Sequence, residues 1–469
     1  MENVKKKKLS IKVPHTYIII VIILIILTAL TYVIPAGSYE RIEDPVTGRN
    51  IVVQGSYARV EQTPVSPFEM VMSIADGMVE ASDIIFFIFF AYGFVFMLIK
   101  TGAFYGFMGT LVKKFKGSEK MIFPVFMAMF GICGSTFGMY EETYGLLPAF
   151  IGIAIALGYD GLVGGATVVL GTATGFAAAT LNPFTIGIAQ GIAELPIGSG
   201  IVYRIICFIA FEGTAIWYLM RYANKVKNNP ELSIVKGVQF NVTEGMTREK
   251  MESLPFNTRH KFIMFLFLVT IGILVYGTSQ LGWYLSELGA LFIIMMVAVG
   301  LVGGFSFSEI ASNFVESVSE VVFGALVVGI ARSLTLVMEN GNIIDTIVFN
   351  MSNVLANFSV KFAAVGMVIV QNLINFFIPS GSGQAATSMP IMVPLSDSIG
   401  LNRQIATLAF QFGDGFSNMF WPTAVATECG LMGIPIEKWY KFMTPLFGIF
   451  VILQIIFIIG AVMINYGPF

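Results

Sequence analysis

The chain has few charged side chains and few of the residues that metal or disulfide sites require. Charged residues make up 12% of its 469 residues, about half of the roughly 25% usual in soluble domains. The three cysteines lie in apolar segments without metal-ligand spacing, and the two histidines lie beside apolar runs. We therefore expect no disulfide framework and no metal site. The net charge of −2 gives no indication of a nucleic-acid partner.

Long apolar runs dominate the chain instead. Hydrophobic residues make up 56% of it, and the mean hydropathy is +0.80. This composition predicts an all-α membrane protein with several crossings. The first apolar run, Tyr17–Ile34, follows the lysines Lys5–Lys8 and is longer than the roughly 7–15 apolar residues of a signal peptide. We expect a retained first helix with a cytoplasmic N-terminus, in a bacterial plasma (inner) membrane.

A polar stretch, Phe377–Pro390, interrupts two short apolar runs, Phe362–Phe377 and Met389–Ile399. Each run is shorter than the roughly 20 apolar residues of a bilayer crossing. Backbone groups left unpaired in hydrocarbon cost several kcal/mol each, so the polar centre has to be covered by protein or line a wet cavity. The pattern predicts a re-entrant hairpin; the alternative is one kinked transmembrane helix.

A second stretch, Gly131–Pro148, has the same layout of apolar arm, small polar tip, proline and apolar arm. Pro390 lies 242 residues after Pro148, and Gly341 lies 239 residues after Gly102. The near-constant offset predicts an internal duplication. Matching interruptions in two halves indicate a transporter binding site. Other pairs lie 239 or 240 residues apart: Phe68 and Phe307, Gly175-Phe176 and Gly415-Phe416, Pro183 and Pro422.

The pattern of apolar runs divides the chain into five parts. An odd number of crossings separates the two repeats, so we expect the second repeat to be inverted. Within the second repeat, Phe307–Glu320 is predicted to lie in the membrane interface before a crossing at Val321–Met338. The parts are 1–67, a helix and outside loop; 68–221, the first repeat, with a hairpin at 121–157 and a broken helix at 162–183; 222–261, a cytoplasmic linker; 262–303, a scaffold helix pair; and 304–469, the second repeat, with a hairpin at 361–399 and a broken helix at 403–422.

Positive charges support this topology. Of the 27 lysines and arginines, the topology places 20 on the cytoplasmic side, five outside and two within helices. Positively charged loops are enriched on the cytoplasmic side of membrane proteins. A topology with one crossing fewer would distribute the lysines and arginines over both sides of the membrane.

The hairpin tips and broken crossings carry small polar residues where a lipid-facing helix would not. Unwinding a helix frees N–H groups that attract anions and carbonyl groups that suit cations. We expect one shared site, with the first helix broken at Thr172–Ala177; for single residues, close helix packing is the simpler explanation. The predicted substrate-binding residues are Ser135, Thr136, Glu141, Glu142, Thr180, Asn182, Arg332, Ser380, Ser382, Gln384, Asp414, Asn418 and Thr423; the ion-binding candidates are Ser135, Gly175, Ser382 and Asp414.

Charged side chains within predicted crossings indicate function, because placing a charge in the membrane costs free energy. Arg332 lies inside a predicted crossing, where a charge costs at least about 2.5–3.5 kcal/mol. It is either a clamp for a substrate carboxylate or half of an internal ion pair. Glu141, Glu142, Asp414 and Glu428 outnumber it. This imbalance favours a cationic or zwitterionic substrate, or a coupling cation.

The motifs at these sites resemble the YfcC-type members of the anaerobic dicarboxylate-carrier group, within the ion-transporter superfamily. The resemblance covers nearly the whole chain. It implies an elevator-type carrier with scaffold and transport domains, often a homodimer, with arginine/ornithine antiporters and four-carbon dicarboxylate carriers among its relatives. The tip Ser-Gly-Ser-Gly differs from the Ser-Asn-Thr of sodium-coupled dicarboxylate relatives. The motifs are Ile378–Ala386, Phe412–Asn418, Gly138–Thr143, Gly329–Arg332 and Ala189–Ala193.

We therefore expect a secondary active transporter of an amino acid or a related amine-bearing metabolite. Exchange of basic amino acids is one mode of such transport. The alternative is a four-carbon dicarboxylate carrier coupled to sodium or protons. No cofactor is expected apart from a coupling Na⁺ or H⁺, and the partners are a small-molecule substrate, the lipid bilayer and a second copy of the chain. A membrane-embedded enzyme would need a nucleophile–base pair, ligand cluster or nucleotide loop, none of which we identify. Hairpins entering from opposite sides suit alternating access better than a channel.

Overall fold

The computed structural model describes residues 16–43, 50–53, 55–114, 117–240, 253–355 and 358–467. Its regular structure is almost entirely helical, as the composition predicts. Four short strands form two antiparallel pairs, β1 with β4 and β2 with β3. The elements are α1 (Thr16–Leu30), β1 (Gly37–Ser38), β2 (Arg41–Glu43), β3 (Asn50–Val52), β4 (Ala58–Arg59), α2 (Pro67–Glu80), α3 (Ser82–Lys100), α4 (Ala103–Lys114), α5 (Ile122–Phe137), α6 (Leu147–Ala156), α7 (Gly161–Ala177), α8 (Ile186–Ile192), α9 (Ile201–Asn228), α11 (Thr258–Gln280), α12 (Leu285–Gly303), α13 (Phe307–Asn340), α14 (Ile344–Leu355), α15 (Val360–Phe377), α16 (Gly381–Ser398), α17 (Arg403–Asn418), α18 (Pro422–Met432) and α19 (Ile436–Met463), with short 3₁₀ turns at Glu119–Met121, Glu141–Leu146 and Pro230–Leu232.

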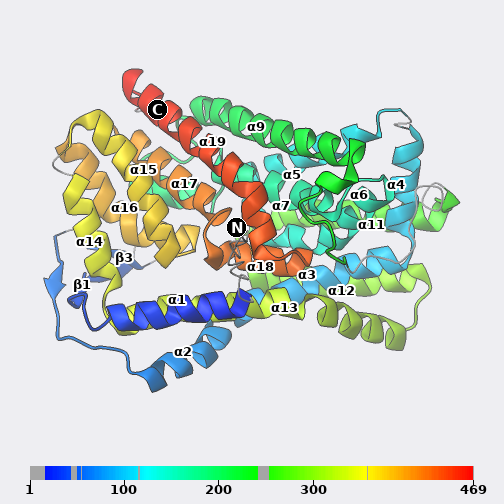
Figure 1. Ribbon diagram of the computed structural model, residues 1–469, viewed down its shortest axis with the longest axis horizontal. Coiled ribbons are helices and arrows are strands. Elements are labelled where there is room, and N and C mark those ends of the chain that lie inside the picture. The colour runs from blue at the N-terminus through cyan, green and yellow to red at the C-terminus, as the bar shows by residue number, and fades with distance from the viewer. Residues whose placement is uncertain are drawn as a thin grey trace, which may run out of the picture.

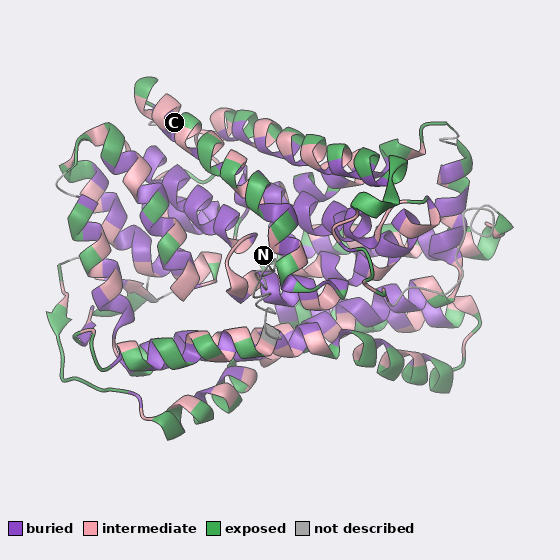
Figure 2. Ribbon diagram, viewed as in Figure 1, coloured by how far each residue is buried: buried purple, intermediate pink, exposed green. Residues whose placement is uncertain are grey.

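Eight helices in the described part of the chain are long and apolar enough to cross a membrane. Two shorter apolar helices, at Tyr17–Leu30 and Gly161–Ala177, accompany them. The outer helices carry many exposed residues (Figure 2). Large apolar side chains are among them, including Ile18 on α1, Ile209 on α9 and Ile452 on α19, as expected for a surface that faces lipid. The predicted multi-pass membrane class is thus supported. The lysines before the first helix lie outside the described residues.

The helices α2 and α3 together match α13 in length and in the way they begin. Pro67–Lys100 and Phe307–Asn340 each span 34 residues. Each run begins with a capping box, in which a serine hydroxyl accepts a backbone N–H and a glutamate accepts the serine's N–H. The serines, Ser66 and Ser306, lie 240 residues apart, as the predicted duplication requires.

These two runs pack against each other in opposite directions. Lys100, the last residue of α3, pairs with Glu316 in the first half of α13 at 2.9 Å. Glu80, the last residue of α2, pairs with Arg332 in the second half of α13 at 2.8 Å. The expectation of an interfacial Phe307–Glu320 separate from the following crossing is wrong, because α13 is one continuous helix. Its packing along α2 and α3 stabilises the whole length.

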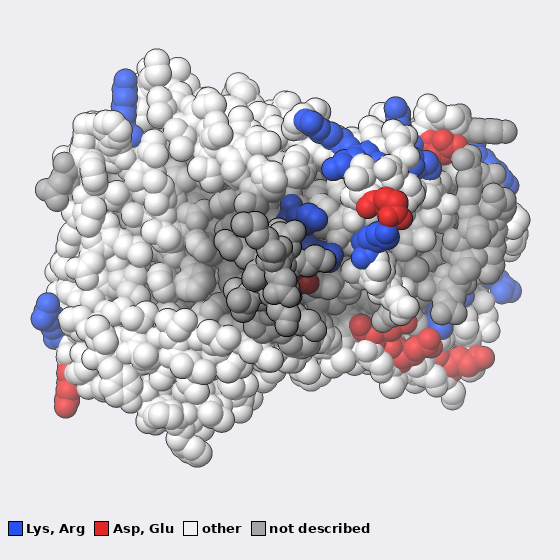
Figure 3. Space-filling view, in the orientation of Figure 1, with Lys and Arg blue, Asp and Glu red and all other residues white. Residues whose placement is uncertain are grey.

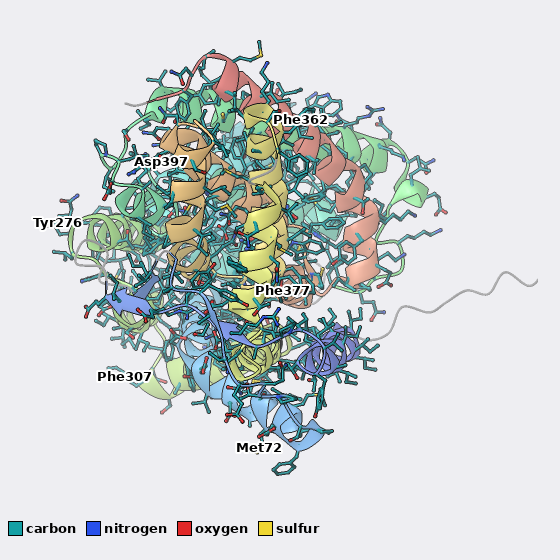
Figure 4. The ribbon with its side chains drawn as sticks, turned by 90° about the vertical axis from the view of Figure 1, so that its left-hand side faces the viewer. Met72, Tyr276, Phe307, Phe362, Phe377 and Asp397 are labelled. Carbon is teal, nitrogen blue, oxygen red and sulfur yellow. The ribbon has the colours of Figure 1, made fainter. Side chains whose placement is uncertain are left out.

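The two predicted hairpins are pairs of helices joined by short irregular turns. Figure 4 shows Phe362 and Asp397 at one end of the α15–α16 pair and Phe377 at the other, so the chain reverses between the two arms. The kinked-helix alternative is therefore wrong for this stretch. In the first repeat, α5 and α6 are separated by Gly138–Tyr140 and a 3₁₀ turn.

The hairpins pack on the inner helices of their own repeats. The first hairpin's α5 packs on α7, the second hairpin's α15 packs on α17, and α7 crosses α17. In Figure 1, α9 and α19 lie along one side of this inner group, and α1 and α13 lie along the other. The crossing of α7 and α17 brings the two repeats together at the centre.

Candidate functional site

Hydrogen bonds join the tip of the first hairpin to the irregular segment after α7. Gly138 ends α5 in the left-handed region, with φ 73°, where a Cβ atom would be strained. In the preceding turn, the carbonyl oxygen of Ser135 accepts the N–H groups of Thr180, Leu181 and Asn182 at 2.9, 3.1 and 3.2 Å. The predicted residues Ser135, Thr180 and Asn182 therefore lie together.

The break in the first broken helix, predicted at 162–183, comes later in the chain than expected. α7 continues through Thr172–Ala177, and the irregular segment covers residues 178–185 before α8. The glycine of the predicted break, Gly175, instead allows close packing, because a Cβ atom there would collide with the carbonyl oxygen of Gly131 on α5. The ion-binding candidate Gly175 thus lies in a helix contact.

Side chains from distant helices satisfy carbonyl groups at the end of α7 and in the irregular segment after it. The buried guanidinium of Arg204, on α9, donates to the Thr180 carbonyl oxygen at 3.1 and 3.2 Å. The amide of Gln411, on α17, donates to the Phe176 carbonyl oxygen at 2.8 Å. The irregular segment is therefore held in a fixed shape.

The second hairpin is held together by amide side chains between its arms. Gln384 on α16 donates to the carbonyl oxygen of Gln371 on α15 at 2.8 Å and to its side-chain oxygen at 2.7 Å. At the tip, Ser380 caps α16, and its hydroxyl accepts the Gly383 N–H at 3.3 Å. Gln384 therefore connects the two arms, although it was predicted as a substrate ligand.

The irregular segment after α7 contacts both hairpin tips. A Cβ atom added at Gly138 would lie 2.5 Å from the side-chain oxygen of Asn182. A Cβ atom added at Gly381 would lie 2.6 Å from the methyl carbon of Thr185 and 3.1 Å from Oδ2 of Asp414. Both tips therefore need glycine, and the segment between Asn182 and Thr185 connects them.

Asp414 is the ionisable residue at this meeting point, and its relative exposure is 0%. Asn375, on α15, donates to its Oδ1 atom at 2.9 Å. The other oxygen, Oδ2, has no hydrogen-bond partner. Asp414 lies beside Gly381, the first residue of α16, where the positive end of the helix dipole favours a negative charge.

Other buried polar atoms at the same place are also unpaired. They are Oδ1 of Asn375, Oγ1 of Thr185 and Nδ2 of Asn182. Leaving such a group unpaired costs about 1–3 kcal/mol. The unpaired oxygens of Asp414, Asn375 and Thr185 are the kind of ligand that hard cations prefer. We define these four residues as the tip cluster.

A second group of acids surrounds the tip of the first hairpin. Tyr140 donates its hydroxyl to Oε1 of Glu428, on α18, at 2.8 Å. Glu428 is fully buried, and its Oε2 atom has no hydrogen-bond partner. The neighbouring Glu142 accepts the Tyr140 N–H at 2.8 Å, whereas Glu141 is partly buried. Tyr140 thus connects α18 to the first hairpin.

Arg332 lies inside α13, a candidate membrane span, as the sequence predicts. Its side chain is 37% exposed on the surface of the single chain. Its guanidinium pairs with Glu80 on α2 at 2.8 Å, and Glu339 lies 4.0 Å away. Of the two predicted roles, this geometry matches an ion pair, although with a different acid from those expected.

The remaining predicted residues occupy varied positions. Thr136 donates to the Ile132 carbonyl oxygen within its own helix at 2.6 Å. The Thr423 hydroxyl is buried without a partner, and Ser382 and Asn418 are partly buried. The sequence analysis missed Asn375, Thr185 and Arg204. An amide within the apolar run Phe362–Phe377 was the available signal for Asn375; Thr185 had none.

A family model and two relatives match nearly the whole chain. The model of a family described as "DcuC: C4-dicarboxylate anaerobic carrier" matches residues 13–463. An uncharacterised protein of Haemophilus influenzae is 29% identical over 98% of this chain and 99% of its own. The "putative basic amino acid antiporter YfcC" of Escherichia coli is 29% identical over 97% of each chain.

Two solved transporter structures also align with the chain. MtrF of Neisseria gonorrhoeae, described among antimetabolite efflux pumps, has 17% identity and a TM-score of 0.45, covering 96% of this chain and 95% of its own. The YdaH transporter of Alcanivorax borkumensis has 13% identity and a TM-score of 0.44, covering 97% of this chain and 100% of its own.

Proposed function

Because the chain belongs to the C4-dicarboxylate anaerobic carrier family, we propose that it is a secondary active transporter of an amino acid or a related amine-bearing metabolite. It is a multi-pass membrane protein of a transporter family, and we place it in a bacterial inner membrane. The observation that carries the substrate proposal is the tip cluster. There, a buried carboxylate with an unpaired oxygen lies where both hairpins meet the irregular segment after α7.

The charges near the hairpin tips support a substrate with a positive group. Asp414 and Glu428 are buried carboxylates with unpaired oxygens. Arg204 is the basic side chain bonded to the irregular segment, and its guanidinium already donates to Thr180 and Ser199 carbonyl oxygens. A buried acid is stabilised by an opposite charge, so an ammonium or guanidinium group fits this region.

Coupling to a cation is the second part of the proposal. The oxygens of Asp414, Asn375 and Thr185 would supply ligands for Na⁺, or Asp414 would carry H⁺. Occupying such a site would satisfy atoms that are otherwise unpaired. The predicted Ser135 and Ser382 remain ion-binding candidates at the two tips, and the predicted substrate residues remain proposals around them.

The arrangement of the helices supports an elevator mechanism as the third part of the proposal. We propose that the hairpins, α7, α8, α17 and α18 move as one body against α1–α4 and α11–α14, in a homodimer. The matched capping boxes and the opposite directions of α2–α3 and α13 support an inverted repeat, which makes the two end states of such a motion similar.

The second candidate is a four-carbon dicarboxylate carrier, which the description of the family favours. Two carboxylates would meet Asp414 and Glu428 without a free basic partner at the described tips, unless both acids carry protons. The printed name of the Escherichia coli relative instead favours a basic amino acid. The two candidates differ in the sign of the charge that the site must hold.

Uptake into proteoliposomes decides between them. Labelled arginine, ornithine, a neutral amino acid and succinate are offered under imposed Na⁺, proton and voltage gradients, with and without internal amino acid. We expect saturable uptake of an amine-bearing solute. Uptake of succinate alone would overturn the amino-acid proposal and support the dicarboxylate carrier.

A further inference from the structure

A cavity away from the tip cluster is lined by residues of the two groups of helices that the elevator proposal separates. Its volume is about 70 Å³, more than the roughly 10–15 Å³ that one water molecule requires. Tyr92 on α3 and Glu320 on α13 form one wall, and the end of α18 forms another wall. The complete lining is Tyr92, Pro148, Ile151, Gln239, Phe240, Glu320 and Gly430–Gly433.

The first wall carries a positioned negative charge. Tyr92 is buried, and its hydroxyl donates to Oε2 of the exposed Glu320 at 3.0 Å, which orients the carboxylate. One turn earlier on α13, Glu316 is already paired with Lys100. In the described part of the chain, no lysine, arginine or histidine lines the cavity. Lys100, outside the lining, interacts electrostatically with Glu320 as well, and Glu320 is the charged group of the lining itself.

The wall formed by the end of α18 is also electronegative. Gly430–Gly433 is the last turn of α18 and its cap, and Gly433 is in the left-handed region with φ 67°. A helix C-terminus carries a partial negative charge from its unpaired carbonyl groups. A cation in the cavity would be attracted by both walls, whereas an anion would be repelled by both.

The remaining walls are apolar and connect the cavity to the linker. Pro148 and Ile151 come from the first hairpin, and Phe240 comes from the linker after α9. The ring of Phe240 also packs against Gly161, where a Cβ atom would lie 2.5 Å from it. Such a lining suits an aliphatic or methylene stem beside a charged head group.

We propose that this cavity is a second binding site, for an organic cation with an ammonium or guanidinium head and an apolar stem, with Glu320 as its charge partner. The assignment of this cation as the transported substrate rests on the proposed function, but its binding does not. By the predicted topology, the site lies on the cytoplasmic side, between the tip cluster and the cytoplasm. The acidic side chains gathered at the lower right of Figure 3 lie where Figure 1 draws the first half of α13.

Thiol labelling tests the charge of the cavity without requiring transport. Gln239 is exposed and lines the cavity, so Gln239→Cys reports on it. The full-length chain in nanodiscs is reacted with a trimethylammonium and with a sulfonate methanethiosulfonate reagent; the chain without the new cysteine gives the background from Cys133. We expect Glu320→Gln to lower the ratio of cationic to anionic rates by about two- to sixfold.

The matched control is Glu316→Gln, which removes the same charge from the same helix one turn away. We expect it to change the ratio by less than half as much, because Glu316 is paired with Lys100. Tyr92→Phe keeps the carboxylate and should keep the high ratio, so it serves as a second readout if Glu320→Gln folds poorly. Equal ratios in the two glutamate variants would overturn the proposal.

Occupancy is measured with ethylguanidinium as the probe. It should slow the labelling of Gln239→Cys by a neutral reagent in the chain with Glu320, and by less than half as much in Glu320→Gln. If ethylguanidinium protects neither variant, the cavity is not a cation site, even if uptake experiments support amino-acid transport. If it protects while uptake of amines fails, the second site stands and the proposed function fails.

Discussion

At the scale of single residues, burial and pairing distinguish the two ionisable residues that the sequence made most prominent. Asp414 is fully buried and has one oxygen atom without a partner. Arg332 is partly exposed and paired with Glu80. The buried, incompletely paired group is the one whose environment requires a ligand or a proton, because an uncompensated buried charge is costly.

Replacing Asp414 by Asn should separate binding from folding. The amide removes the charge but keeps the shape, so the melting temperature of Asp414→Asn should be equal to or higher than that of the unchanged protein. The KM of a cationic substrate should rise by about 30-fold or more, since losing a buried charge contact costs about 2–5 kcal/mol. Uptake kinetics and a thermal melt measure the two effects.

Asp397→Asn is the matched control for this substitution. Asp397 is an exposed aspartate that pairs with Arg403 at 2.7 Å at the far end of the second hairpin. Its replacement should leave KM within about twofold, because an exposed pair contributes roughly 0–1 kcal/mol. Normal kinetics in Asp414→Asn would remove Asp414 from the site.

Arg332 should behave as a partly exposed ion pair. A double-mutant cycle with Arg332→Ala and Glu80→Ala should give a coupling free energy of about 0.2–1 kcal/mol in thermal or chemical unfolding. Discrimination between a substrate and its decarboxylated analogue should survive in Arg332→Lys. If that discrimination is lost while the fold is retained, Arg332 binds the substrate carboxylate and the clamp is correct.

At the scale of elements, the glycines lie where helices pack closely, and the helices break at other positions. α5, α7 and α17 pass one another at positions where a Cβ atom would collide with neighbouring backbone, including Gly175 against Gly131 and Gly415 against Ala177. Small residues at such crossings let membrane helices approach closely. The breaks lie elsewhere, in 178–185 and between α17 and α18.

Gly175→Ala should therefore destabilise the protein through overpacking alone. The added methyl would meet the Gly131 carbonyl oxygen, and overpacking of this kind costs about 1–3 kcal/mol. Gly213→Ala on α9 is the matched control, because no atom lies within 4 Å of its added Cβ. It should be neutral or stabilising, since alanine favours a helix by about 1 kcal/mol over glycine. Equal melting temperatures would contradict the close contact.

At the scale of the whole molecule, the direction of each half relative to the membrane is the feature to test. The ion pairs Lys100–Glu316 and Glu80–Arg332 fix α2–α3 and α13 in opposite directions. The predicted topology places the loop before α2 outside and the end of α9 in the cytoplasm. Opposite orientations of the two repeats require these two sites to lie on opposite sides.

Cysteines introduced at exposed positions measure this directly. Glu61→Cys lies before α2, and Asn228→Cys lies at the end of α9; both original side chains are exposed. In intact cells a membrane-impermeant maleimide should label the first and not the second, and inverted vesicles should give the reverse. Labelling of both from one side would exclude the inverted arrangement.

The sequence by itself determined the membrane class, the family and the two interrupted segments. Apolar length, the cost of unpaired backbone in hydrocarbon and the distribution of lysine and arginine act locally, so they can be recognised without a fold. The repeat offset also anticipated the paired capping boxes at Ser66 and Ser306. These features together predict a helical, multi-pass chain and the two places where it reverses.

Only the tertiary structure decided which polar residues meet. Asp414, Asn375 and Thr185 come from three segments, and nothing local distinguishes the buried Thr185 from the helix-bonded Thr136. Arg332 lies within a crossing helix as predicted, but its partner Glu80 comes from the packing of α2 against α13. The burial and pairing of a side chain depend on the residue that lies opposite it across a helix interface. Local sequence patterns do not identify that opposite residue.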